Sequence, residues 1–136
     1  MKLPTKVKVG FRTYKINFEY EHEENDGYCH HNDSRLDISK DLKEGTPRGE
    51  VVLHEILHAI FHNYGINTTM PEDEEEKLVN TLGLALTTVI KDNPTAMRWL
   101  IKEVTKKDGR VRRTRNDAGV QSKGAASQSL DGTTGT

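Results

Sequence analysis

Cysteine is nearly absent from this sequence: the 136 residues include only Cys29, so no disulfide can form within the chain. Long apolar runs are missing too, and no stretch approaches the ~18 consecutive apolar residues that a transmembrane helix needs. The opening Met-Lys-Leu-Pro-Thr-Lys-Val-Lys contains no apolar signal core. We therefore expect a cytoplasmic protein that has no membrane partner.

Apolar residues are scarce, at 33% of the chain, and they are unevenly distributed. They concentrate between Val7 and Val104, so we expect one folded domain over residues 1–105 and a disordered basic and polar tail over residues 106–136. The tail has seven basic and three acidic side chains, a net charge of +4, which leaves −5 for the domain. An acidic domain does not favour nucleic acid as a partner.

The periodicity of the apolar residues predicts an α+β fold. A period of two indicates a strand pair over residues 6–20 that turns near Gly10, and a second pair follows at residues 28–30 and 35–38. Helical spacing then predicts three helices. They run from an N-cap at Thr46 to Asn63, from Pro71 to Ile90, and from Pro94 to Val104. We expect a small antiparallel sheet packed on two to three helices.

The first predicted helix carries the sequence His54-Glu55-Ile56-Leu57-His58. Two histidines four residues apart lie on one helical face, where both imidazoles can bind one Zn²⁺. The intervening Glu55 can act as general base on a water molecule at the metal, as in metallopeptidases. The alternative is a helix that merely carries surface histidines. The neighbouring Leu53 and Leu57 favour a partly buried site instead.

A catalytic zinc needs a third protein ligand, and the pattern leaves its identity open. Phe61 and Tyr64 occupy the positions where a metzincin has glycine and its third ligand, so that class is excluded. His62 continues the four-residue spacing, but a straight helix turns it well away from His54. The acidic start of the second predicted helix offers Glu75, at the centre of the apolar stripe, and Glu76, in line with Gly83.

Other polar residues could also line the site. His30 and His31 lie in the strand region and either could line the cleft or bind a transition state, although surface polar residues are the simpler interpretation. For the oxyanion-stabilising role the candidates are Tyr28, His30, His31 and Tyr64, and the pattern does not distinguish among them. We expect the strand over residues 35–39 to form one wall of the cleft, with an edge to which a peptide could add.

From about Lys6 to Leu100 the sequence resembles the ImmA/IrrE family of zinc peptidases, and more closely the compact phage-encoded metallopeptidases related to it. The resemblance lies in these stretches: Gly27-Tyr28-Cys29-His30, Arg35-Leu36-Asp37-Ile38-Ser39, residues 52–60 and Asp92-Asn93-Pro94. The second helix also resembles the family's Glu-x-x-Ala-x-x-Phe-Ala pattern, but with Val79 and Leu82 in place of Ala and Phe.

The resemblance implies a gluzincin site with one zinc ion held by His54, His58 and Glu76, with Glu75 as the alternative third ligand. It also implies an endopeptidase that cleaves a protein substrate, often a regulator such as a repressor, and a phage or prophage origin. The alternative function is a zinc-stabilised binding or regulatory module, similar to an antirepressor, that has lost turnover. A metal-independent interaction protein is a third possibility.

Overall fold

The computed structural model describes residues 1–108 of the chain. Its elements are, in order, β1 (Lys6–Val9), β2 (Arg12–Tyr20), β3 (Gly27–His30), β4 (Arg35–Ser39), α1 (Thr46–Asn63), α2 (Glu72–Asp92) and α3 (Pro94–Val104). The predicted α+β class is therefore confirmed. The disorder expected in the tail falls mostly on residues 109–136, which lie outside the described residues.

The chain divides into two units, of which the first spans Met1–Pro94 and the second begins at Thr95. The first unit contains the sheet, α1 and α2, and it carries all the residues of the predicted site. The eleven-residue helix α3 begins at Pro94, because proline is well tolerated in the first turn of a helix, and its remaining residues belong to the second unit.

The sheet has the strand order β1-β2-β4-β3. β1 pairs antiparallel with β2, and β3 pairs antiparallel with β4, but β2 and β4 run parallel. The sheet is thus mixed and not wholly antiparallel as expected, because β4 inserts between β2 and β3 instead of adding at the outside. It follows that β4 is paired on both sides, so the expected free edge at residues 35–39 is wrong. The edge strand on this side is β3.

Backbone conformation sets the ends of α1. Gly45, with φ 97°, precedes the helix, and no side chain caps its start, so Thr46 is the first helical residue and not the N-cap we predicted. Pro47 lies in the first turn, where its missing N–H costs no helical hydrogen bond. After Asn63 the chain reaches Gly65 at φ 71°, a left-handed conformation that glycine adopts without steric cost. The predicted end of the helix is confirmed.

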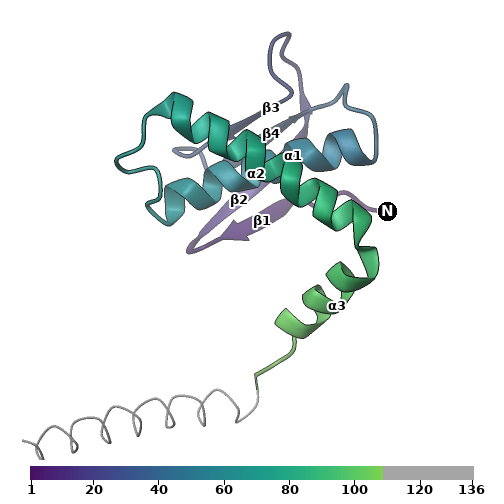
Figure 1. Ribbon diagram of the computed structural model, residues 1–136. Coiled ribbons are helices and arrows are strands. Elements are labelled where there is room, and N and C mark those ends of the chain that lie inside the picture. The colour runs from purple at the N-terminus through teal and green to yellow at the C-terminus, as the bar shows by residue number, and fades with distance from the viewer. Residues whose placement is uncertain (109–136) are drawn as a thin grey trace, which may run out of the picture. The chain divides into compact units, whose positions relative to one another are not determined.

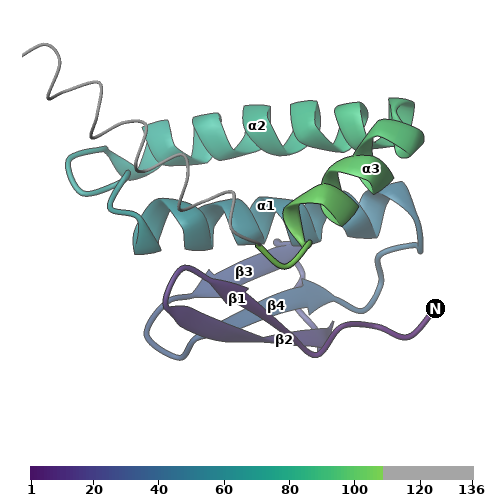
Figure 2. The ribbon, with the colours of Figure 1, turned by 90° about the horizontal axis from the view of Figure 1, so that it is seen from below.

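Helix α1 lies between the sheet and α2 (Figure 2). On its sheet side a core cluster contains Val9, Tyr14, Leu36 and Ala59. On its other side Leu57, Phe61 and Val79 form a second cluster with α2. Each aliphatic side chain buried in this way contributes roughly 1.5–3 kcal/mol. Both faces of α1 are therefore held, which fixes the rotation of the helix about its axis.

Helix α2 turns back along α1, so its acidic first turns lie beside the C-terminal half of α1 (Figures 1 and 2). The two helices approach closely at Gly83, where a Cβ atom would lie 3.8 Å from His54 Cα. This approach brings the start of α2 within reach of the histidine side chains of α1. No helix among residues 1–108 is long and apolar enough to cross a membrane.

Candidate metal centre

His54 and His58 converge on one point. Their Nε2 atoms lie 3.1 Å apart, as expected for imidazoles one turn apart on the same helical face. Their side chains are 20% and 16% exposed, so both rings are largely shielded from solvent but open on one side. Burial and the adjacent His58 lower the pKa of His54 and favour its neutral form, the form in which imidazole binds metals.

Glu76 completes the group. Its Oε1 lies 3.1 Å from His54 Nε2 and its Oε2 lies 3.0 Å from His58 Nε2. One ligand atom from each of these three residues can be chosen so that all lie within 4.8 Å of one another. Among residues 1–108 this is the one group of three or more such side chains that could hold a metal ion.

Glu75 occupies a different position from its neighbour. Its Oε1 lies 3.6 Å from His58 Nδ1, the ring nitrogen that faces away from the metal position, and it accepts a hydrogen bond of 3.2 Å from Asn67 Nδ2. A carboxylate beside the second nitrogen of a metal-binding histidine orients the ring and raises its basicity. Glu76 therefore belongs to the group that could hold a metal ion, whereas Glu75 lies beside the second nitrogen of His58.

The three residues fit a zinc ion. A tetrahedral zinc with bonds of ~2.0–2.1 Å needs ligand atoms roughly 3.3 Å apart, and the Nε2 and carboxylate contacts among the three residues are 3.0–3.1 Å long. Two imidazoles and one carboxylate also form a donor set that suits zinc and leaves a fourth position open. His54, His58 and Glu76 could therefore hold such an ion without rearrangement.

Glu55 is buried beside this group. The residue is 5% exposed, and no hydrogen bond to its carboxylate is found within residues 1–108. Burial, followed by the charge of Glu76, raises its pKa to about 8. The carboxylate lines the cleft described below, where a bound ligand or a water molecule can reach it.

The group opens into a cleft of about 360 Å³. Edge strand β3 forms one wall and the start of α2 the other. Besides the residues above, the cleft is lined by Asn25, Gly27, Tyr28, Cys29, His31, Asn67 and Glu72. Charged and polar atoms dominate this lining, which suits a polar substrate with backbone groups to bind.

Several candidates from the sequence lie outside the cleft. His30 Nε2 lies 2.7 Å from Asp37 Oδ2, in a network with Arg35 and Asn17 on the sheet face opposite α1. His62 stacks on His31 and is not part of the metal-binding group. The ring of Tyr64 packs against Gly10. Of the four oxyanion candidates, only Tyr28 and His31 line the cleft.

Asn67 and Cys29 are among the cleft residues that the sequence did not predict. Asn67, in the loop between α1 and α2, donates to Glu75, and nothing in its local sequence distinguishes it from an ordinary loop asparagine. Cys29 lines the cleft, and burial together with the charges of Glu55 and Glu75 raises its pKa to about 12. Only the alternation of side chains along residues 27–30 could have predicted this position, because it places Cys29 on the sheet face that packs against α1.

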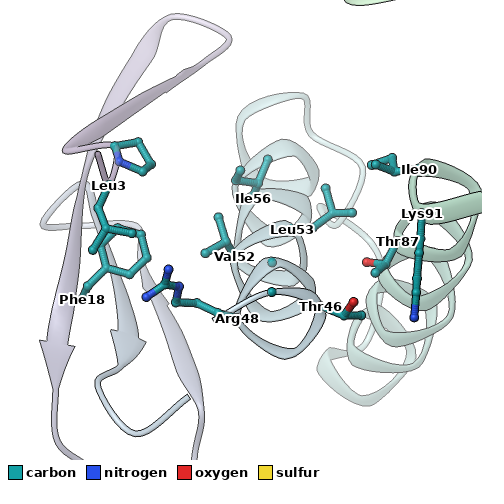
Figure 3. A pocket seen from close by; sticks show the side chains of 13 residues that line it. Leu3, Phe18, Thr46, Arg48, Val52, Leu53, Ile56, Thr87, Ile90 and Lys91 are labelled. Carbon is teal, nitrogen blue, oxygen red and sulfur yellow. The ribbon is translucent and has the colours of Figure 1, made fainter. Parts of the chain in front are cut away.

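A larger cavity of about 620 Å³ lies at the other end of α1, among Phe18 of β2, Val52 and Leu53 of α1 and Ile90 of α2 (Figure 3). Its lining is almost wholly apolar, and its charged side chains are Arg48 and Lys91. This cavity contains no histidine, cysteine or carboxylate, whereas the smaller cleft contains the group that could hold a metal ion. No protein-family model, curated protein or solved structure matches the chain.

Proposed function

We propose that the protein is a zinc-dependent endopeptidase with its active site at His54, Glu55, His58 and Glu76. One observation carries the proposal: two Nε2 atoms and one carboxylate meet at 3.0–3.1 Å beside a buried carboxylate that has no hydrogen-bond partner of its own within residues 1–108. A metal site with a purely structural role would not need this additional carboxylate. A cluster of histidine and glutamate side chains on the surface would leave such a carboxylate exposed to solvent.

The ligand roles belong to His54, His58 and Glu76, with Glu75 and Asn67 holding His58 in place. When bound, zinc would polarise the scissile carbonyl and make a neighbouring water more acidic. Glu55 accepts the proton of the attacking water and then donates it to the leaving amine. A raised pKa suits this exchange, because a group that titrates near neutral pH can both take up and release a proton.

The proposed substrate is a protein segment in extended conformation. Edge strand β3 pairs only with β4 within the described sheet, and Gly27, Tyr28 and Cys29 of this strand line the cleft. A peptide that adds to such an edge gains main-chain hydrogen bonds without any particular sequence. We propose the same role for β3 that the sequence suggested for residues 35–39. We also propose a cytoplasmic location, since the chain has one cysteine.

The test compares wild type with Glu55→Gln and with Glu74→Gln, an exposed glutamate at the start of α2. Metal content is measured by mass spectrometry and hydrolysis by mass spectrometry of a peptide library. We expect one zinc in all three proteins, cleavage by wild type and Glu74→Gln, and a loss of at least about 100-fold in Glu55→Gln. Zinc without any cleavage would favour the non-catalytic binding module. A folded wild type that binds no added zinc would refute both.

A further inference from the structure

His31 directly follows β3 and has an unusual setting. Its ring stacks on that of His62, with centroids 4.0 Å apart and planes 11° apart, and it also lines the cleft. Arg12 donates a hydrogen bond to its carbonyl oxygen, which fixes the backbone at this point. The ring is therefore held both by stacking and through its backbone. Such restraint is more than a surface turn residue needs.

A buried hydrogen-bond chain determines how this ring is protonated. Asn63 Nδ2 lies 2.7 Å from the carbonyl oxygen of Ala59 and 2.8 Å from Tyr14 OH. Because a carbonyl only accepts, the atom of Asn63 facing it must be the NH₂ group. That group also only donates, so the Tyr14 oxygen accepts from it. The hydroxyl hydrogen of Tyr14 is then free for another acceptor.

Within the described residues the other polar partner of Tyr14 OH is His31 Nδ1, 3.4 Å away, so with Asn63 as the donor to Tyr14 this nitrogen is the acceptor. Tyr14 is fully buried, so its hydroxyl cannot donate a hydrogen bond to bulk water. The Cys29 thiol also reaches the same nitrogen, at 3.5 Å. A nitrogen that accepts carries no hydrogen, and a neutral imidazole then carries its one proton on the other nitrogen, Nε2.

His31 is neutral at ordinary pH. Burial, followed by the nearby His62, His58, Arg12 and His30, lowers its pKa to about 4. No hydrogen bond to its Nε2 is found within residues 1–108. With Nδ1 directed at Tyr14 and one ring face on His62, the Nε2–H edge is the part of the ring left for the cleft.

We propose that His31 is a catalytic residue whose Nε2–H donates a hydrogen bond to the substrate carbonyl oxygen as negative charge develops on it. Tyr14 and Asn63 are the positioning residues that fix its tautomer. The inference rests on the proposed peptidase function and extends it. A neutral donor suits this role, because it stabilises the charge in the transition state and keeps its proton throughout. Its removal should cost about 100- to 1000-fold in kcat.

The tautomer is testable without turnover or metal. Long-range ¹H–¹⁵N spectra of the full metal-free chain, labelled in histidine, report which ring nitrogen carries hydrogen. We expect His31 to be protonated at Nε2 in wild type and in Tyr20→Phe. Tyr14→Phe removes the donor to Nδ1 and should produce a mixture of tautomers. Protonation of Nδ1 in wild type would overturn the proposal.

Kinetics then test the catalytic role. His31→Phe keeps an aromatic ring on His62 but removes the donor, so zinc content and KM should stay near wild type while kcat falls. His31→Gln keeps an N–H donor and should recover part of the rate. His22→Phe, at an exposed histidine of the loop after β2, is the matched control and should keep full kcat.

The outcomes separate the two proposals. If wild type binds zinc but cleaves nothing, the peptidase function fails, and with it the catalytic role of His31. If wild type cleaves and His31→Phe keeps its kcat, the peptidase function stands and this inference alone is wrong. An unchanged tautomer in Tyr14→Phe would likewise reject the positioning role of Tyr14.

Discussion

Glu55 Oε1 lies 2.8 Å from the position that a Cβ atom on Gly27 would occupy, and Val51 Cγ1 lies 2.7 Å from it. Real Cβ atoms do not approach other atoms so closely. The absence of a side chain on Gly27 is therefore what allows edge strand β3 to pass directly over the carboxylate. The strand proposed to bind substrate and the proposed base are thereby held in contact.

We expect Gly27→Ala to displace either the Glu55 side chain or β3. Displacement of a general base by about 1 Å can cost on the order of 100-fold in rate, so kcat should fall strongly while zinc content stays at one. Steady-state kinetics and metal analysis of the purified variant would measure both.

Gly49→Ala is the matched control for this change. Gly49 lies in α1, and a Cβ atom there would meet nothing within 4 Å. Alanine is favoured over glycine within a helix by up to ~1 kcal/mol, so this variant should keep full activity and be slightly more stable. Full activity in Gly27→Ala would contradict the contact between β3 and Glu55.

The ligand and support roles of the two adjacent glutamates predict different metal affinities. Glu76→Ala removes a proposed ligand and should abolish stoichiometric zinc binding. Glu75→Gln keeps the ligands but weakens the support of His58, so affinity should fall about 10- to 100-fold. Competition with a chromophoric chelator measures both constants, with the exposed Glu74→Ala as control. A larger loss in Glu75→Gln than in Glu76→Ala would reverse the assignment.

The same two residues show where sequence reasoning stops. The spacing of His54 and His58 suffices to place both on one face, because i, i+4 geometry is local to a helix. Glu75 and Glu76 differ by about 100° around α2, and only the packing of α2 on α1 selects between them. The alignment with Gly83 favours Glu76, which the structure places with His54 and His58, whereas the centre of the apolar stripe favours Glu75.

The strand order was beyond prediction for a similar reason. Alternating residues identify each strand, and the turn at Gly10 identifies the first hairpin, because both are local features. Whether β4 pairs with β2 as well as β3 depends on contacts between residues such as Ile16 and Leu36, twenty positions apart. Because of that pairing the edge strand is β3 and not β4, and β3 is the strand that lines the cleft.

Asp37 should make a large, pH-dependent contribution to stability. It is 3% exposed and accepts hydrogen bonds from Asn17, Arg35 and His30. Burial by itself would raise its pKa, but these hydrogen bonds outweigh it and lower the pKa below the ordinary value. Asp37→Asn removes the charge that these donors share, and we expect a loss of about 3 kcal/mol at pH 7.

The pH dependence follows from the direction of the shift. Because the folded-state pKa lies below the unfolded value of about 3.9, the charged network stabilises the fold fully above that value and is lost as pH falls through the folded pKa. The difference in unfolding free energy between wild type and Asp37→Asn should therefore shrink below about pH 4. Urea unfolding at several pH values measures it, with the exposed Asp33→Asn as control. A difference that does not change with pH would refute the network.

Cys29 should be an unreactive thiol although it lines the cleft. Its pKa is raised to about 12, first by burial and then by the charges of Glu55 and Glu75, and Arg12 offsets this only in part. At pH 8 such a thiol is ionised in roughly one molecule in 10,000, against about one in four for an ordinary cysteine. The loss of thiolate exceeds the gain in its intrinsic nucleophilicity, so alkylation should be about 100-fold slower than in the urea-unfolded chain.

The cause of this shift can be separated by substitution. Glu55→Gln removes one of the two charges that raise the pKa of Cys29, so the folded variant should react faster than wild type with iodoacetamide at pH 8. Glu74→Gln changes a glutamate outside the cleft and should leave the rate unchanged. Equal rates in wild type and Glu55→Gln would mean that the charge of Glu55 does not protect the thiol. A folded wild type that reacts at the unfolded rate would show that Cys29 does not face the carboxylates at all.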